Sequence, residues 1–495
     1  MNEGQLRAFQ LAKNGFNLFI TGSAGTGKSF LLRLIIDELL KERTVAVTAS
    51  TGTAAHIIGG ITLHSWLALG LAKEPIDVLL RRIKRYSSCS ENIRKTQVLI
   101  IDEISQVRGE FLDKIDTCCK HVRKNNFPFG GIQVIICGDF AQLPPVMSLD
   151  LERELDQSYK PEPISNKNPE IDYAFKSDVW KSMNLKTAYL REVVRQRGDP
   201  TFVRILNNLR EGRVNDEDFQ PLLKCIGRKF SSPDVDNSHN IFPTRLVPTN
   251  AEAARINQSF YSALEGEENI YHARFHVKRK RRQNRNMEIE NQIVERMLHY
   301  TKTHGTLDPS LPLKVGTRVI LTQNINVRLG LFNGAQAIVE KFVNLLDAGA
   351  EGIQIATPDQ LKKTSTEGSY ETESLPALEN SSNTVPVIRL VDKEILYALL
   401  PNTTEVRSDF DDEPNIVVQM TQYPLRHAWG LTIHKSQGMT LERALINAGR
   451  FIFSPGQTYT ALSRVRSLEG LSLVDFDPNK VIVDPSVVEF YKNLV

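Results

Sequence analysis

Residues 17–29 read NLFITGSAGTGKS and combine a strand pattern with a phosphate-binding pattern. The apolar run that begins at Leu18 predicts a buried β-strand, and residues 30–41 predict a helix. Between them stands G-x-x-x-x-G-K-S, whose glycines let successive backbone N–H groups face phosphate oxygens at the start of a helix. We therefore predict a phosphate-binding loop formed by Gly22, Ser23, Ala24, Gly25, Thr26, Gly27, Lys28 and Ser29. Lys28 is expected to contact the β and γ phosphates of ATP, and Ser29 to bind Mg²⁺.

Three further apolar runs follow in the first third of the chain: TVAVTA (44–49), VLIIDE (98–103) and VIICGD (134–139). They alternate with amphipathic stretches, and this alternation is typical of a parallel α/β sheet. Each run ends at Gly, Ser, Thr or Asp residues. In open α/β sheets, ligands bind at the carboxyl ends of the strands, so these residues are predicted to gather at one site.

The acidic pair Asp102 and Glu103 stands at the end of the VLIIDE run. Asp102 is expected to hold Mg²⁺, directly or through water, and Glu103 to act as the general base that polarises the attacking water. The next run leads into GDFAQLPPV, where Gln142 is the candidate γ-phosphate sensor. Acidic pairs are usually solvated surface, but this pair ends an apolar strand of a P-loop sequence.

Composition limits the class of protein. The 495 residues are enough for two to four domains, and 41% are hydrophobic and 24% charged. No apolar stretch approaches the roughly 20 residues of a membrane span, so no membrane partner is expected. The net charge of +3 does not itself indicate a polyanionic partner, so any nucleic-acid site must be built from local groups.

The five cysteines and the N-terminus indicate an intracellular protein. No C-x-x-C spacing suggests zinc or a disulfide framework. The first residues lack the plan of a signal or transit peptide. We expect a catalytic core of a longer parent, located in the nucleus or mitochondrion of a eukaryote or in a bacterial cytoplasm.

The strand and helix patterns also suggest domain bounds. A first lobe is expected over residues 1–176, with a small insertion at about 66–95. A second α/β lobe is expected over 177–334 and 417–495, interrupted by an all-β module at 335–416. Residues 262–310 are expected to form a basic helical or loop insertion, and the Ser/Thr/Glu-rich residues 362–385 a linker.

Six motifs resemble the superfamily 1B helicases in identity and order: GSAGTGKS, TASTGTAA, IIDEIS, GDFAQLPPV, HKSQGMT and YTALSR. Residues 103–140 are similar to the signature of the petite-integration-frequency (Pif) DNA helicases, relatives of RecD. The resemblance implies an α/β fold of two tandem RecA-like P-loop NTPase lobes, with a small wedge-like insertion in the first lobe and an SH3-like insertion in the second. It also implies a DNA helicase that uses ATP and Mg²⁺ and translocates 5′ to 3′.

The resemblance assigns further residues at the ATP site. Gln5 matches the glutamine that reads adenine, and Gly438 belongs to the same site. Arg195 in EVVRQ and Arg464 in TALSRV match the arginine fingers. Such a cation stabilises the charge on the departing phosphate only when the two lobes close on it.

Candidate nucleic-acid contacts occur in both lobes. In the first lobe they lie at predicted strand ends beside the ATP site, at Ser50, Thr51, Gly52, Thr62, His64 and Ser65. In the second lobe the resemblance places them at Thr432, His434, Lys435, Ser436 and Gln437. Trp66 and Trp429 are either stacking platforms or, more commonly for such positions, core residues. The basic run KRKRRQNR (278–285) is either a solvated loop, a phosphate contact or a nuclear localisation signal.

Substrates implied by the resemblance are single-stranded DNA, junctions, forks, RNA–DNA hybrids and G-quadruplexes, in replication, repair, recombination and telomere maintenance. Single-strand-binding or replication proteins are candidate partners, and a monomer is expected. Two alternatives stay open: an RNA helicase of superfamily 1, and a P-loop switch that binds nucleic acid without processive unwinding.

Overall fold

The computed structural model describes most of the chain and divides it into two compact units. The first unit comprises Met1–Phe230, Pro243–Ala254 and Leu431–Val495, and the second comprises Ser231–Phe242 and Arg255–Gly430. The described residues are 1–67, 74–85, 87–145, 170–230, 243–279, 291–295, 297–298, 301, 308–323, 325–326, 329–331, 334–356, 384–390, 395–406 and 416–494. None of the helices in these ranges is long and apolar enough to cross a membrane.

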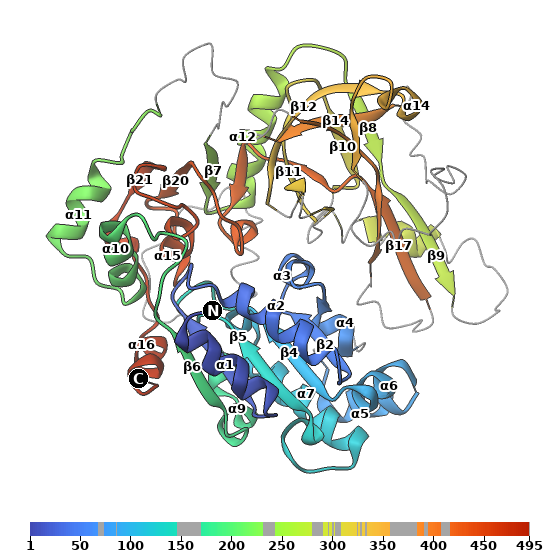
Figure 1. Cartoon of the computed structure of the whole chain (residues 1–495), viewed down its shortest axis with the longest axis vertical. Coiled ribbons are helices and arrows are strands. Elements are labelled where there is room, and N and C mark those ends of the chain that lie inside the picture. The colour runs from blue at the N-terminus through green and yellow to red at the C-terminus, as the bar shows by residue number, and fades with distance from the viewer. Residues whose placement is uncertain are drawn as a thin grey trace. The chain divides into compact units, whose positions relative to one another are not determined.

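The first unit contains a six-stranded sheet in the order β3-β2-β4-β5-β1-β6 (Figure 1). All its pairs are parallel, as the alternating sequence pattern predicts. The strands are β1 (Leu18–Gly22), β2 (Val45–Ala49), β3 (Ile61–Thr62), β4 (Val98–Asp102), β5 (Gln133–Cys137) and β6 (Lys186–Leu190). The helices around it are α1 (Glu3–Lys13), α2 (Lys28–Leu39), α3 (Gly52–Ile57), α4 (Leu63–Leu67) and α9 (Asp178–Ser182).

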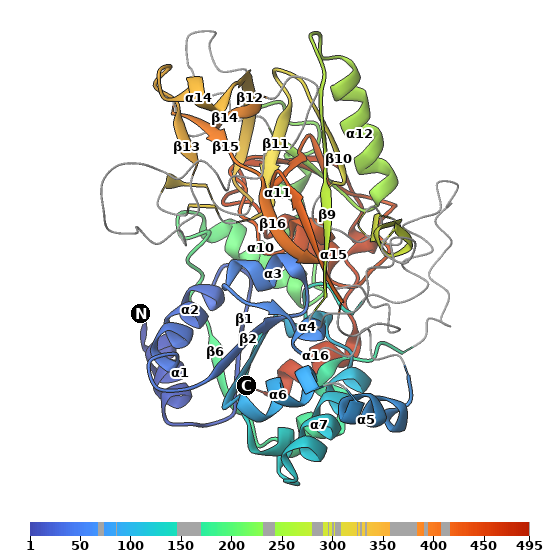
Figure 2. The ribbon, with the colours of Figure 1, turned by 90° about the vertical axis from the view of Figure 1, so that its right-hand side faces the viewer.

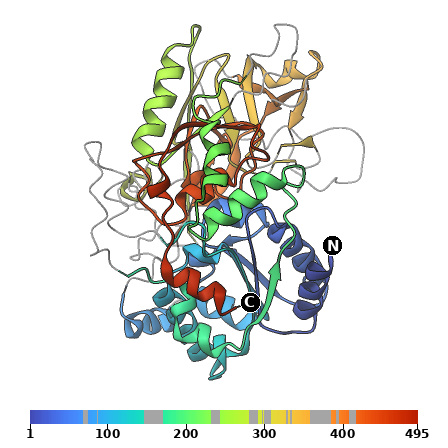
Figure 3. The same ribbon diagram turned by 90° about the vertical axis from the view of Figure 1, so that its left-hand side faces the viewer.

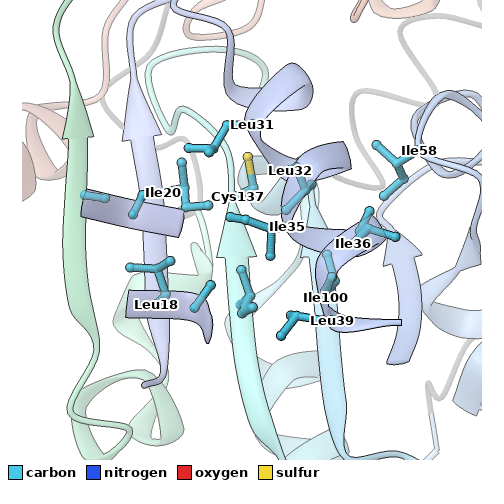
Figure 4. Packing of buried hydrophobic residues seen from close by; sticks show 14 of the residues in the cluster. Leu18, Ile20, Leu31, Leu32, Ile35, Ile36, Leu39, Ile58, Ile100 and Cys137 are labelled. Atoms are coloured by element: carbon cyan, nitrogen blue, oxygen red, sulfur yellow. The ribbon is translucent and has the colours of Figure 1, made fainter. Parts of the chain in front are cut away.

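Both faces of this sheet are covered, which explains why its central strands are apolar throughout. On one face, α2 packs its apolar side over β1, β4 and β5 (Figure 4). The helix contributes Leu31, Leu32, Ile35, Ile36 and Leu39 to a buried cluster with Leu18, Ile20, Ile100 and Cys137. Phe19 points to the opposite face, where its ring lies 5.0 Å from Trp180 and 5.8 Å from Phe140. Successive side chains of β1 therefore point to opposite faces of the sheet and pack into two different cores.

Three helices form a bundle beside this sheet: α5 (Ile76–Arg85), α6 (Ser87–Lys95) and α7 (Gly109–Arg123) (Figure 2). The first two occupy the insertion expected at 66–95. At its start, Trp66 is buried and its indole nitrogen donates to Thr96 Oγ1 at 3.3 Å. Trp66 is therefore a core residue in this structure.

A second, four-stranded sheet of order β19-β7-β20-β21 lies mostly in the same unit. Strand β20 runs parallel to both of its neighbours. The strands are β7 (Thr244–Val247), β19 (Gly430–Thr432), β20 (Ala444–Ala448) and β21 (Leu471–Phe476). Its helices are α10 (Pro200–Arg210), α11 (Asp216–Leu223) and α15 (Gln457–Leu462). The pair of parallel sheets matches the two expected α/β lobes.

The C-terminal helix α16 (Pro485–Lys492) packs against the first sheet's side of the unit, near β6 (Figure 3). Phe490 stacks on Phe175 with ring centroids 4.4 Å apart. Tyr491 lies edge-on to Tyr189 of β6 at 6.3 Å. The end of the chain thus returns to the lobe in which it begins.

The second unit is built mostly of antiparallel strands around two buried hydrophobic clusters. Helix α12 (Asn250–Ser262) leads into this unit, which also contains the short helix α14 (Leu345–Ala348). A six-stranded sheet has the order β13-β15-β14-β12-β11-β18, and smaller sheets have the orders β10-β8 and β16-β17-β9. One pair, β13 with β15, is parallel. The strands are β8 (Asn269–His272), β9 (Arg274–Arg279), β10 (Ser310–Leu313), β11 (Arg318–Leu321), β12 (Gln336–Val343), β13 (Gln354–Ala356), β14 (Val385–Leu390), β15 (Leu396–Leu399), β16 (Asn402–Val406), β17 (Ile416–Gln422) and β18 (Leu425–His427).

These sheets differ from the expected domain bounds in two places. Strand β6 pairs with β1, so the first sheet continues past residue 176. Strands β11 and β18 pair with each other, and β11 pairs with β12, so the β module extends beyond 335–416 on both sides. Edge strands of this kind are chosen by long-range pairing, which a local pattern does not reveal. The basic run at 280–285 and most of the Ser/Thr/Glu-rich stretch lie outside the described residues.

Candidate active site and nucleic-acid interface

The phosphate-binding loop connects β1 to α2, as its sequence predicts. Gly25 and Gly27 have φ values of +82° and +80°, in the left-handed region that favours glycine. A Cβ at Gly25 would stand 2.7 Å from Gln196 Oε1 and 2.8 Å from Arg195 Cβ. The loop is therefore shaped to admit the Arg195 segment, whose backbone N–H donates to the Gly25 carbonyl at 3.2 Å.

Lys28 begins α2, and its ammonium group lies against the loop. It donates to the carbonyl oxygens of Gly22 and Ser23 at 2.9 and 3.0 Å. Gln5 is buried in the first turn of α1, where it forms a capping box with Asn2. Its amide nitrogen lies 3.0 Å from the position that a Cβ on Gly27 would take. The predicted adenine-reading residue therefore touches the loop, although it does not line the cavity described below.

The acidic pair follows β4. The carboxylate of Asp102 accepts a hydrogen bond from the Glu103 backbone N–H at 2.9 Å. Burial raises the pKa of Asp102, and the negative charge of Glu103 raises it further. Glu103 itself has a φ of +52°, which is uncommon for a residue with a side chain and often marks a functional position.

Two arginines also reach this region, Arg464 from the second lobe and Arg195 from the segment that follows β6 of the first sheet. Arg464 follows α15 and is 2% exposed; its guanidinium donates to Gln142 Oε1 at 3.3 Å and to Thr460 O at 2.9 Å. Arg195 donates to the carbonyl of Ser463 at 2.9 Å. Burial and the nearby charge of Arg464 lower the pKa of Arg195 to about 9. Two cations held side by side, one of them fully buried, favour a bound anion.

Most of these groups line one cavity of about 500 Å³. Its walls include most of the predicted site: the loop from Ala24 to Ser29, Asp102, Glu103, Gln142, Arg195, Gly438 and Arg464. Gly22 and Ser23 do not line the cavity. Their carbonyl oxygens accept hydrogen bonds from the Lys28 ammonium group. A cavity of this volume suits a ligand of the size of a nucleotide.

Further residues line the cavity that the sequence did not single out, among them Phe30, Val194, Thr440 and Arg466. Phe30 directly follows Ser29 and is 56% exposed. An exposed aromatic residue in the first turn after a phosphate-binding loop is a signal that could have been noticed. Arg466 lies two residues beyond Arg464, and its guanidinium pairs with Glu442 at 2.6 Å.

The first-lobe nucleic-acid candidates lie just after β2 and β3. Ser50 donates from its backbone to the Asp102 carbonyl at 3.2 Å, which places this loop next to the acidic pair. The hydroxyl of Thr51 accepts from Ala54 N, and Gly52 begins α3. Thr62 and Ser65 form a turn whose hydroxyl groups are 2.8 Å apart.

His64 stacks on Phe111, with ring centroids 4.2 Å apart. Burial lowers the pKa of His64 to about 4, so the ring is neutral near pH 7 and does not offer a phosphate a positive charge.

In the second lobe the candidates form the turn after β19. Lys435 is exposed, and its ammonium group lies 3.1 Å from Asn250 Oδ1. Thr432 and Ser436 are buried, and their hydroxyls bond within the turn. Burial also lowers the pKa of His434 to about 4. In this structure the turn therefore presents Lys435, and not its hydroxyl groups, to a ligand.

The class of protein follows from the two parallel sheets that contribute opposite walls of this cavity: the chain is a P-loop NTPase with two RecA-like lobes. A family model described as PIF1-like helicase matches residues 1–220, and one described as DNA helicase Pif1, 2B domain, matches residues 300–342. The ATP-dependent DNA helicase PIF1 of Candida albicans is 34% identical over an alignment of 531 positions, which covers 97% of this chain and 55% of that relative. The ATP-dependent DNA helicase Pif1 of Psychrobacter is also 34% identical, over 97% of this chain and 69% of that relative.

Solved structures agree. The crystal structure of Pif1 helicase from Candida albicans matches with a TM-score of 0.75 and 33% identity, covering 100% of this chain and 99% of that chain. Bacteroides Pif1 in complex with ADP-AlF3 and ssDNA matches with a TM-score of 0.60 and 26% identity, covering 100% and 96%. This chain belongs to the PIF1-like helicase family. It spans 55 to 64% of the length of the first six curated relatives that it matches.

Proposed function

We propose that the chain is an ATP-dependent DNA helicase that moves 5′ to 3′ along single-stranded DNA. The observation that carries this proposal is the convergence of Lys28, Asp102 and Glu103 of the first lobe with Arg464 of the second lobe around a single cavity, which Arg195 of the segment after β6 also lines. Chemistry that needs both walls couples hydrolysis to the approach of the lobes, which is what a stepping motor requires.

Each group has a role in hydrolysis. Lys28 contacts the β and γ phosphates, while Glu103 orients the attacking water and accepts its proton. Arg195 and Arg464 stabilise the charge that spreads over the γ-phosphate oxygens in the transition state. Gln142 accepts a hydrogen bond from Arg464, so its contact with the γ phosphate would link the presence of that phosphate to the position of the second lobe.

The donor set also fits Mg²⁺, which prefers carboxylate and hydroxyl oxygens together with phosphate. We assign Ser29 and Asp102 to the ion. Burial and, secondly, the negative charge of Glu103 raise the pKa of Asp102, and a divalent cation would favour its charged form. The ion supplies electrostatic stabilisation of the phosphate oxygens when it is bound.

DNA is the proposed nucleic-acid substrate because the similar solved structures are of Pif1 helicases with DNA. One is Bacteroides Pif1 bound to ssDNA, and another describes unwinding at forked dsDNA by two coordinating Pif1 helicases. The phosphate contacts proposed for this chain are the first-lobe loops at residues 50–52 and 62–65 and, in the second-lobe turn at 432–436, the exposed Lys435. Forks, RNA–DNA hybrids and G-quadruplexes are the proposed substrates, in genome maintenance.

The test is steady-state ATP hydrolysis by the purified chain with Mg²⁺, in the presence of single-stranded DNA, single-stranded RNA of the same sequence, or no polymer. We expect DNA to raise kcat well above the polymer-free rate. Equal stimulation by RNA would favour an RNA helicase, and no stimulation by either polymer would refute the motor. Lys28→Ala is the control: it should reduce turnover below roughly a tenth of wild type, because phosphate stabilisation is worth several kcal/mol, while single-strand binding stays measurable.

A further inference from the structure

A glutamine of the second lobe contacts the proposed general base. The side-chain amide of Gln437 donates to Glu103 Oε2 at 2.9 Å. Gln437 is buried and follows the turn that contains Lys435 and Ser436. A residue next to a proposed DNA contact therefore holds the carboxylate on which hydrolysis depends.

The same glutamine also contacts the first-lobe loop through one intermediate. The amide nitrogen of Gln106 donates to Gln437 Oε1. Ser50 in turn donates from its hydroxyl to Gln106 Oε1 at 3.4 Å. Gln106 lies in the 3₁₀ turn that directly follows Glu103. A continuous hydrogen-bonded relay thus runs from Ser50 through Gln106 and Gln437 to Glu103.

The relay bears on the orientation of Glu103. A general base must aim a carboxylate oxygen at the water that it deprotonates. Glu103 Oε2 accepts the hydrogen bond from the Gln437 amide, so this oxygen cannot also point at the water while that bond is in place. The backbone of Glu103 lies in the left-handed region, a costly conformation that persists only because the surrounding structure imposes it. Burial lowers the pKa values of Arg464 and Arg195, and the negative charge of the nearby Glu103 opposes that shift, so a change in this carboxylate also reaches the two arginines.

We propose that Gln437 is a positioning residue that restrains Glu103 and releases it when a DNA phosphate occupies the turn at Lys435 and the loop at Ser50. The inference rests on the proposed function and deepens it, because it names the connection by which DNA stimulates hydrolysis. Ser50, at the start of the relay, and Lys435, two residues before Gln437, are both backbone-phosphate candidates, so the signal is independent of base sequence.

The experiment measures kcat and KM for ATP with and without single-stranded DNA in wild type and in Gln437→Met, a replacement of similar volume that removes both hydrogen bonds. We expect the DNA-free kcat to rise roughly tenfold, the factor that one hydrogen bond to a charged group provides. The DNA-stimulated kcat should change by less than about twofold, and KM should stay unchanged, so the stimulation ratio falls.

Gln106→Met breaks the relay one step earlier and should raise the DNA-free rate in the same direction. The double variant should equal Gln437→Met, since residues of one relay are not additive. Gln220→Ala, an exposed glutamine of α11, is the matched control and should leave both rates at wild-type values. Circular dichroism melts would verify that each variant is folded; if Gln437→Met does not fold, Gln106→Met alone decides.

The outcomes are separable. Loss of stimulation in wild type would refute the proposed function. A stimulated wild type combined with an unchanged or lower DNA-free rate in the variants would overturn the relay. Equal losses in both rates would show that Gln437 supports structure or chemistry without transmitting DNA occupancy.

Discussion

The hydroxyl of Tyr459 accepts a hydrogen bond from the backbone N–H of Ala24 at 2.7 Å. The two residues come from opposite lobes, since Ala24 belongs to the phosphate-binding loop and Tyr459 to α15. The same hydroxyl donates to Asp139 Oδ2 at 3.2 Å. Because α15 leads into Arg464, this contact fixes the proposed arginine finger relative to the phosphate-binding loop.

Tyr459→Phe should therefore lower kcat several-fold with little change in ATP affinity. It removes only a hydroxyl, but it leaves a buried N–H without its acceptor, at a cost of about 1–3 kcal/mol. Steady-state ATPase measurements with saturating single-stranded DNA test this. Tyr261→Phe in the second unit loses a similar hydrogen bond, to Glu268 at 2.8 Å, and should leave kcat unchanged. Equal effects of the two variants would contradict a specific role for Tyr459.

Asp139 and Arg210 form a buried ion pair at the base of this contact, with N–O distance 2.8 Å and both side chains almost fully inaccessible. Arg210→Ala should lower the free energy of unfolding of the first unit by about 3–5 kcal/mol, because it leaves a buried carboxylate without its cation. Urea unfolding measures the loss. Arg213→Ala removes an exposed pair and should cost less than about 1 kcal/mol. A small effect of Arg210→Ala would mean that Tyr459 and Tyr491 satisfy Asp139 alone.

The same pair predicts an acid dependence. Although burial alone would raise it, the charge of Arg210 lowers the pKa of Asp139 below its ordinary value. A carboxyl whose folded-state pKa is lowered contributes stability above its unfolded pKa of about 4 and loses that contribution as the pH falls further. Unfolding midpoints between pH 5 and 3 should therefore decline more steeply for wild type than for Asp139→Asn. If the unfolding midpoints of wild type and Asp139→Asn decline equally with falling pH, the Asp139–Arg210 ion pair is not the source of the acid dependence.

Arg195→Ala and Arg464→Ala should each reduce kcat at least about 100-fold while ATP affinity changes far less, because a finger acts mainly in the transition state. Turnover measurements and binding of a fluorescent ATP analogue separate the two quantities. Arg197→Ala, an exposed neighbour, is the matched control. Losses of equal size in affinity and kcat would assign the arginines to ground-state binding.

Polarity is the prediction that depends most on the family. Both lobes are proposed to grip the phosphate backbone in turn, and family resemblance puts the leading lobe toward the 3′ end. The chain should therefore unwind a duplex with a 5′ single-stranded tail and act poorly on blunt or 3′-tailed duplexes. Gel-based strand displacement with ATP and Mg²⁺ measures this. Preference for the 3′ tail would reverse the proposed direction, and DNA-stimulated hydrolysis without unwinding would favour a switch or a translocase.

Local sequence predicted well the elements whose chemistry is local. The loop from Gly22 to Ser29 needed only its glycines and its position between a strand and a helix. Asp102 and Glu103 followed from an apolar strand that ends in acids. Gln437 was expected at DNA, but its contact with Glu103 depends on a fold that brings residues 334 positions apart together. The burial of Thr432 and Ser436 was likewise not readable from a polar motif.

The sequence by itself determined the α/β class, the order of the motifs and the loop proposed to meet phosphate, because short-range periodicity and glycine geometry encode them within a few residues. Only the tertiary structure decided that β6 completes the first sheet, that α16 returns to that sheet, and that Tyr459 and Gln437 meet the first lobe. Those contacts join segments hundreds of residues apart. They are selected by the burial of apolar faces and the pairing of buried polar groups across the whole unit, a condition that no local pattern contains.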